Sequence, residues 1–129
     1  MKGIELLFLA IGAIVGAFLR YRITEAPMIL GGFSINLLLV NAVGSFILGA
    51  FSVISPFLNL DAHYTLFMSI GFCGSLTSMS SFALETCTFL DNNHLHFAFL
   101  NIIASVALSL GALVLGRELT SIIFNVLVH

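Results

Sequence analysis

The sequence is short of charge. Only 8% of its 129 residues are Asp, Glu, Lys or Arg, and the formal net charge is −2. A water-soluble domain carries about 25% charged residues because its surface must face water. With 60% hydrophobic residues and a mean hydropathy of +1.17, the chain lacks such a surface. We therefore expect an integral membrane protein.

The usual catalytic motifs are missing as well. The sequence has no glycine-rich phosphate loop, no nucleophile elbow and no HExxH zinc motif. Its two cysteines, Cys73 and Cys87, lie 14 residues apart in one apolar stretch. That spacing is about 21 Å along a helix, too far for a disulfide within it. We predict that the protein is not an enzyme and binds no nucleic acid.

The hydrophobic residues fall into four long stretches. They run roughly from Ile4 to Leu19, from Ile29 to Ile54, from Leu66 to Leu90 and from Phe97 to Gly116. A helix needs about 20 residues to cross some 30 Å of hydrocarbon. We predict one all-α domain over residues 1–129, a multi-pass protein of the cell membrane with four transmembrane helices. A cleaved signal peptide is the alternative for the first stretch, but no convincing small-x-small cleavage site follows it.

The basic residues favour neither orientation in the membrane. With four spans, Lys2 and Arg117 fall on one side and Arg20 and Arg22 on the other. The positive-inside rule therefore gives no bias. A chain balanced in this way can insert both ways round, and two copies can then associate antiparallel. Such a dimer has the inverted symmetry that larger transporters obtain by duplication.

Small and polar residues recur at helical spacing in three of the stretches. They are Gly12 and Gly16 in the first, Ser34, Asn41, Ser45 and Gly49 in the second, and Asn101, Ser105, Ser109, Ala112 and Gly116 in the fourth. Small residues at this spacing allow close helix packing, and hydroxyls can bond back to a carbonyl one turn earlier. Asn41 differs because its amide places two donors and an acceptor at mid-membrane. We predict a functional role for Asn41 and favour helix packing for the small residues.

The third stretch contains a segment that is poorly suited to a continuous helix. Seven of the twelve residues of GFCGSLTSMSSF, positions 71–82, are Gly, Ser or Thr. Gly costs a helix about 1 kcal/mol relative to Ala, and hydroxyl side chains compete for backbone bonds. We predict a break in the third helix, whose exposed carbonyls can form a cation site. After the break, Met79 and Phe82 project from one face, where two apolar side chains are usually core.

Taken together, three segments of the chain resemble the Fluc (CrcB) family of fluoride channels. They are GAIVGAFLRY (12–21), LLLVNAVGSFILG (37–49) and GFCGSLTSMSSFALET (71–86), the last close to the family pattern G-F-C-G-G-x-T-T-F-S-T-F-S-x-E. The resemblance covers nearly the whole chain. It implies an antiparallel homodimer, or a heterodimer of two related chains, with two fluoride pores along the subunit interface. It also implies a structural sodium ion on the dimer axis, held by the main-chain carbonyls of Gly74 and Thr77.

The fluoride path is then expected to involve seven residues. They are Asn41, Met79, Ser80, Ser81, Phe82, Ser105 and Ser109. Fluoride is strongly hydrated, so a pore must replace its water with hydrogen-bond donors, without a fixed cation that would trap it. The positive edge of a phenyl ring can also face an anion. The chain departs from the family pattern at Met79, where a first Phe is usual, at Ser75 for Gly, at Ala83 for Ser and at Asn101 for Tyr.

Two other functions remain open besides passive export of cytoplasmic fluoride across the lipid bilayer. A small multidrug exporter also has four helices and can pair antiparallel, but it needs a carboxylate deep in the first helix and an aromatic cage for cations. Glu5 lies too near the end of its stretch, Glu85 is interpreted as an interfacial or helix-pairing carboxylate, and the chain has no Trp. The other alternative is a non-transporting membrane subunit whose small residues only pack helices.

Overall fold

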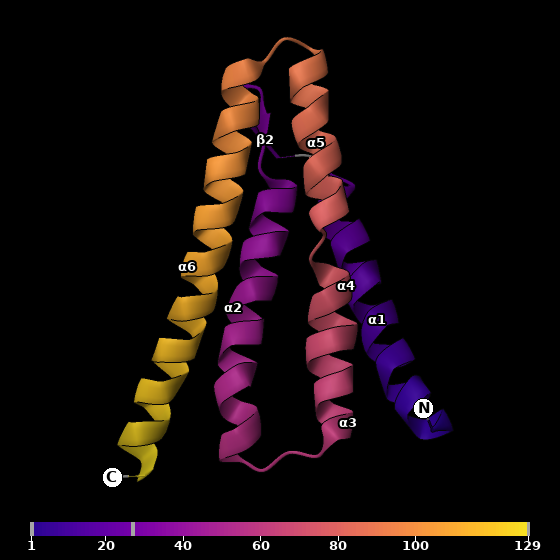
Figure 1. The fold of residues 1–129 in the computed structure, drawn as a ribbon, viewed down its shortest axis with the longest axis vertical. Coiled ribbons are helices and arrows are strands. Elements are labelled where there is room, and N and C mark those ends of the chain that lie inside the picture. Colours follow the sequence, from indigo (N-terminus) through magenta and orange to yellow (C-terminus); the bar gives the residue numbers. More distant parts are fainter. Residues whose placement is uncertain (1, 27, 129) are drawn as a thin grey trace.

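The protein is built from four long helical segments, seen in a computed structural model that describes residues 2–26 and 28–128 (Figure 1). The elements are α1 (Gly3–Thr24), β1 (Ile29–Leu30), β2 (Phe33–Ser34), α2 (Asn36–Phe57), α3 (Ala62–Thr65), η1 (Leu66–Cys73), α4 (Gly74–Leu76), α5 (Met79–Asp91) and α6 (Leu95–Val128). In the described residues, four helical stretches are long and apolar enough to cross a membrane, with α3 to α5 together forming the third. The predicted all-α architecture with four spans is confirmed.

The second span begins later than the sequence predicted. Residues 29–34 form a short antiparallel hairpin, in which Ile29 pairs with Ser34. Its turn consists of Gly31 and Gly32, with φ of 60° and 90°, values that favour glycine and match a two-residue hairpin turn. Because α2 starts only at Asn36, Ser34 lies in a strand and does not belong to the polar stripe of α2.

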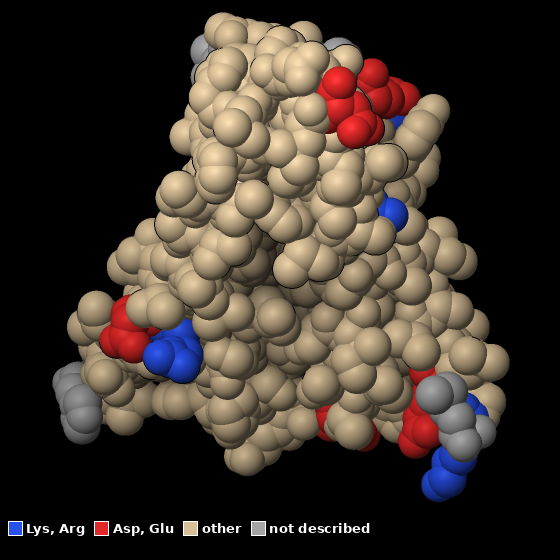
Figure 2. Space-filling model, turned by 45° about the horizontal axis from the view of Figure 1, so that its top comes forward, with Lys and Arg blue, Asp and Glu red and all other residues tan. Residues whose placement is uncertain are grey.

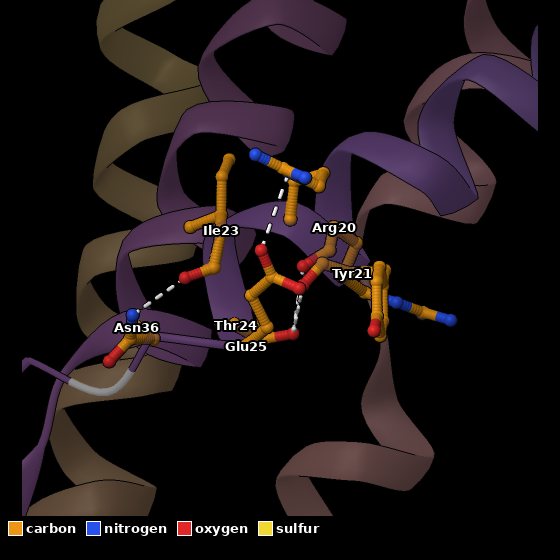
Figure 3. A network of polar contacts seen from close by, with 7 residues as sticks. Arg20, Tyr21, Ile23, Thr24, Glu25 and Asn36 are labelled. Carbon is orange, nitrogen blue, oxygen red and sulfur yellow. Dashed lines mark hydrogen bonds and ion pairs between the residues drawn. The ribbon is translucent and has the colours of Figure 1, made fainter.

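Asn36 anchors the hairpin to the end of α1 (Figure 3). Its Nδ2 donates to the carbonyls of Ile23 at 2.7 Å and Ala26 at 2.9 Å, and its Oδ1 accepts the Met28 N–H. The side chain is buried, so these bonds satisfy backbone groups that lipid could not. One amide thus fixes how the chain passes from the first span to the second.

Glycines provide the close contacts between the spans. An added Cβ at Gly49 would overlap the carbonyl oxygen of Leu113, and one at Gly116 would overlap that of Phe46. These contacts join α2 to α6, which run in the same direction (Figure 1). In the same way, Gly12 and Gly16 of α1 pack against the backbone of η1. The packing interpretation of these four glycines is confirmed.

We expect Gly49→Ala and Gly116→Ala to destabilise the protein. The new methyl group must push a helix backbone away, and overpacking of this kind costs about 1 to 3 kcal/mol. Thermal unfolding in detergent should show a lower Tm for both variants. Gly111→Ala is the matched control, because an added Cβ at Gly111 meets nothing within 4 Å and Ala is the better helix former. An unchanged Tm for Gly116→Ala would contradict the packing role.

The third span is interrupted, as predicted. Thr77 and Ser78 are extended, with ψ of 154° and 113°, so the helix stops at Leu76 and resumes at Met79. Figure 1 shows the interruption as a thin segment between α4 and α5. The sequence did not predict that Leu66–Cys73, just before it, is a π-helix. Such wide turns are rare and are found frequently at functional sites.

Candidate functional site: the helix break and two cavities

The side chain of Asn41, on α2, pairs with the broken backbone. Its Oδ1 accepts the Ser78 N–H at 2.9 Å, and its Nδ2 donates to the Ser78 carbonyl over a longer 3.5 Å. In a continuous helix the Ser78 N–H would bond to the carbonyl of Gly74, so Asn41 frees that carbonyl. The Asn41 amide therefore bonds the N–H and the carbonyl of Ser78, which a continuous helix would otherwise pair. One hydrogen of its Nδ2 remains for another acceptor.

Serine side chains organise the first turn of α5. The Ser78 hydroxyl accepts the Ser81 N–H at 3.1 Å, which makes it the cap of the resumed helix. It donates its only hydrogen to the Ser81 hydroxyl at 2.9 Å. The Ser80 hydroxyl, 3.3 Å from that of Ser78, must then be the donor of that pair. The hydrogen of the Ser81 hydroxyl is left free to donate elsewhere.

A first cavity of about 340 Å³ lies beside the break, between α2, α5 and α6. It is lined by Asn41, Ser45, Thr77, Ser78, Met79, Phe82, Ser105, Val106, Ser109 and Leu110. The structure thus brings together five of the seven residues predicted for the anion path. Its lining contains amide and hydroxyl groups but no charged side chain. We call it cavity 1.

The two apolar residues after the break share one face, as their spacing predicted, and both line cavity 1, but their surroundings differ. Phe82 is half-buried, whereas Met79 is 73% exposed. Leu110, which lines cavity 1 from α6, is also exposed, at 64%. Within a single chain, cavity 1 is therefore open on the side where Met79 and Leu110 are exposed.

A second cavity, of about 370 Å³, borders the start of α5 and the end of α1. It is lined by Arg20, Thr24, Ser34, Asn36, Leu37, Ser81, Leu84, Glu85 and Thr88. We call it cavity 2. Ser81 therefore belongs to cavity 2, and Ser80 lies outside the lining of both cavities. The predicted path residues are divided between two spaces that flank the break.

Cavity 2 contains two charged residues that the sequence placed at the membrane flanks. Arg20 Nη1 donates to the Thr77 carbonyl at 3.4 Å, so its guanidinium reaches the helix break. Glu85 lies in the middle of α5, and its Oε1 is buried with no hydrogen-bond partner within residues 2–26 and 28–128. The first finding corrects our expectation, because a cation reaches the helix break. Glu85 lines cavity 2, and its role as an interfacial or helix-pairing carboxylate stays a prediction.

The carbonyls expected to bind sodium lie at the break. Gly74 is exposed, and an added Cβ there would meet only the Ser69 carbonyl, at an ordinary 3.7 Å. No contact inside the described chain requires a glycine at this position. Thr77 offers its carbonyl from an extended residue, although Arg20 already donates to it. Carbonyl oxygens are the ligand type that hard cations prefer, and two such oxygens form only part of a coordination shell.

Comparison with known proteins shows the family of this chain. The family described as "CrcB-like protein, Camphor Resistance (CrcB)" matches residues 7–117. The chain belongs to the CrcB family. The matched segment of this CrcB protein includes every residue that lines cavity 1 or cavity 2. With its four apolar helices, it is a multi-pass integral membrane protein.

Similar curated proteins carry the name of an ion channel, not of an enzyme. The "Fluoride-specific ion channel FluC" of Nitrosopumilus maritimus is 54% identical over 125 residues, covering 97% of this CrcB chain and 99% of the relative. The protein of the same name from Methanocaldococcus jannaschii is 39% identical over 121 residues, with 94% and 98% covered. That of Methanococcus maripaludis is 39% identical over 113 residues, with 88% and 93% covered.

Proposed function

We propose that this CrcB protein is a fluoride-selective channel that lets cytoplasmic fluoride leave the cell passively, down its electrochemical gradient. The observation that carries the proposal is the lining of cavity 1, in which neutral donors from Asn41, Ser105 and Ser109 surround one space. Neutral donors can replace the water around fluoride without holding the ion as tightly as a fixed cation would. The name shared by the similar proteins supports the same ion.

Among the described residues, no charged side chain lines cavity 1, which fits conduction of an anion. Figure 2 shows the charges near the periphery of the face in view, with uncharged residues between them. Arg20, in cavity 2, offers a positive charge beside the break, where it can attract anions toward the path. Its hydrogen bond to Thr77 keeps the guanidinium at the edge of cavity 1 and outside its lining. We assign Arg20 to the entry of the path.

We propose further that the working unit is an antiparallel dimer. Cavity 1 is open on the side of Met79 and Leu110, both more than 60% exposed, and a second subunit there would close it into a pore. Gly74, exposed at the same break, would lie near its own copy. A homodimer is the simplest form for a chain with balanced basic residues, and a heterodimer with a related subunit is the alternative.

A structural sodium ion at the dimer centre is the third element of the proposal. The carbonyls of Gly74 and Thr77 in each subunit would hold it, supplying hard oxygen ligands from the main chain. The release of the Gly74 carbonyl by Asn41 supports this assignment. Exchange of sodium for N-methylglucamine should lower the Tm of the purified dimer. A Tm that does not respond to sodium would count against the site.

Fluoride efflux from liposomes tests the function. Vesicles containing the pure protein and potassium fluoride should release fluoride to an ion-selective electrode once a potassium ionophore relieves the charge imbalance. Vesicles loaded with potassium chloride should not release chloride. Chloride release at a similar rate would refute the selectivity.

The same assay addresses proton-coupled export. Glu85 lies in the third span and not in the first, but its Oε1 is buried in cavity 2 without a hydrogen-bond partner in the described residues, so it is the carboxylate to test for proton coupling. Fluoride efflux should proceed without an imposed pH gradient and should persist in Glu85→Gln. If efflux requires a proton gradient and stops in Glu85→Gln, the coupled mechanism is correct and the channel proposal fails.

Labelling of a single cysteine tests the orientation. We choose Asn92→Cys in the loop after α5, because the neighbouring Asn93 has a φ of 59° that a cysteine would adopt only with strain. With Cys73→Ala and Cys87→Ser in the background, an impermeant thiol reagent should label about half of the protein from each side. Labelling from one side only would point to a heterodimer or to another architecture. Two lysines added to one loop should shift the ratio.

A further inference from the structure

A series of buried hydrogen bonds links α5 to α6 behind cavity 1. Asn101 is only 1% exposed, and its Nδ2 donates to the Thr86 hydroxyl at 2.9 Å. The Thr86 hydroxyl donates to the Phe82 carbonyl at 2.9 Å. On the other side, the Ser105 hydroxyl donates to Asn101 Oδ1 at 3.4 Å. Asn101 therefore connects two residues of the cavity wall, Phe82 and Ser105.

The direction of the Asn101 amide follows from the number of available hydrogens. A threonine hydroxyl has one hydrogen, and Thr86 gives it to Phe82. Its oxygen can then only accept from Asn101, which must present Nδ2 to Thr86. Oδ1 is left facing Ser105, so the Ser105 hydroxyl is the donor in that pair.

The bond made by Ser105 differs from those of the threonines within helices. Four threonines within helices donate to the carbonyl four residues earlier on their own helix, with distances of 2.7 to 2.9 Å; these are Thr24, Thr86, Thr88 and Thr120. Ser105 donates instead to a side chain, at 3.4 Å. That distance exceeds the usual range for hydroxyl donors, so the bond is weak. Asn101 thus turns Ser105 away from a short bond to the backbone.

We infer that Asn101 is a positioning residue, which keeps the hydrogen of the Ser105 hydroxyl available to an anion in cavity 1. When no anion is near, Asn101 Oδ1 accepts that hydrogen weakly. A strong acceptor such as fluoride draws it away, and little bonding is lost in the exchange. Without Asn101, the Ser105 hydroxyl bonds back to its own helix and holds its hydrogen more firmly. The inference rests on the proposed function, because it assumes that fluoride passes through cavity 1.

Two substitutions tested singly and together separate positioning from packing. We expect Asn101→Leu, which removes the acceptor at similar size, to lower fluoride efflux about threefold or more, the scale of one weak hydrogen bond. Ser105→Ala should also lower efflux. The double variant should conduct like Ser105→Ala alone, because Asn101 then has no hydroxyl to position. Asn125→Leu is the matched control, since it makes the same change on an exposed part of α6 and should leave efflux unchanged.

The outcomes distinguish this inference from the function on which it rests. An equal loss from Asn101→Leu in both backgrounds, or no loss in either, would overturn the positioning role. Efflux unaffected by Ser105→Ala would overturn it as well, while leaving a fluoride channel intact. Absence of fluoride efflux from the unaltered protein would refute the proposed function itself. If Asn101→Leu does not give a monodisperse protein, Asn101→Ala removes the same acceptor without added bulk and carries the same expectations.

Discussion

Asn41→Asp should nearly abolish fluoride efflux while leaving a folded protein. The carboxyl group keeps the shape of the amide and an oxygen that can accept the Ser78 N–H, the shorter of the two bonds at the break. It loses both hydrogens of Nδ2, one of which is the donor that cavity 1 offers to an anion. A charged carboxylate would also repel fluoride directly. We therefore expect at most a few per cent of the original rate, a loss of about 2 kcal/mol or more in barrier height.

The comparison needs a variant with the same chemical change elsewhere. Asn92→Asp, in the exposed loop after α5, should conduct normally. Size-exclusion chromatography must show the same monodisperse peak for Asn41→Asp as for the unaltered protein, since the break depends on residue 41. Near-normal efflux in a monodisperse Asn41→Asp would restrict Asn41 to supporting the backbone at Ser78.

The spans and the break could be predicted because lipid imposes simple demands. Every backbone group in hydrocarbon must be paired, so long apolar stretches must form helices. The segment that begins at Gly71 is rich in Gly and Ser, which weaken a helix, so it predicts an interruption of the third span. The late start of α2 could also be predicted from the sequence, because Gly31 and Gly32 between apolar residues are typical of a hairpin turn. The continuous hydrophobicity from Ile29 onward favours one long helix instead, and that prediction is wrong for Ser34, which lies in β2.

Contacts between distant residues could not be predicted from one sequence. The partner of Asn41 is Ser78, 37 positions away, and nothing in the local pattern around either residue specifies the other. Long side chains add a further uncertainty, because the guanidinium of Arg20 reaches the break from the end of α1. Spacing along α5 did place Met79 and Phe82 on one face. It could not show that this face borders a cavity.

Phe82 should contribute more to the anion path than Met79, although both line cavity 1. Phe82 is the more buried of the two and offers a rigid aromatic edge with positive potential. Met79, exposed and flexible, presents a softer surface. We expect Phe82→Ile to lower fluoride efflux at least about tenfold, which corresponds to about 1.4 kcal/mol in barrier height. Met79→Phe should be tolerated, since it restores the aromatic residue that is usual in the family.

Loss of a phenyl ring can also act by opening a void in the structure. Phe89→Ile is the matched control, because Phe89 is on the same helix and packs against Phe33 with ring centroids 5.6 Å apart, outside the lining of both cavities. Both variants should have a lower Tm. Only Phe82→Ile should also show the large drop in fluoride efflux, and Phe89→Ile should conduct at close to the normal rate. If a monodisperse Phe82→Ile conducts at the normal rate, the ring only packs against its neighbours and the anion is coordinated by the hydroxyl and amide donors alone.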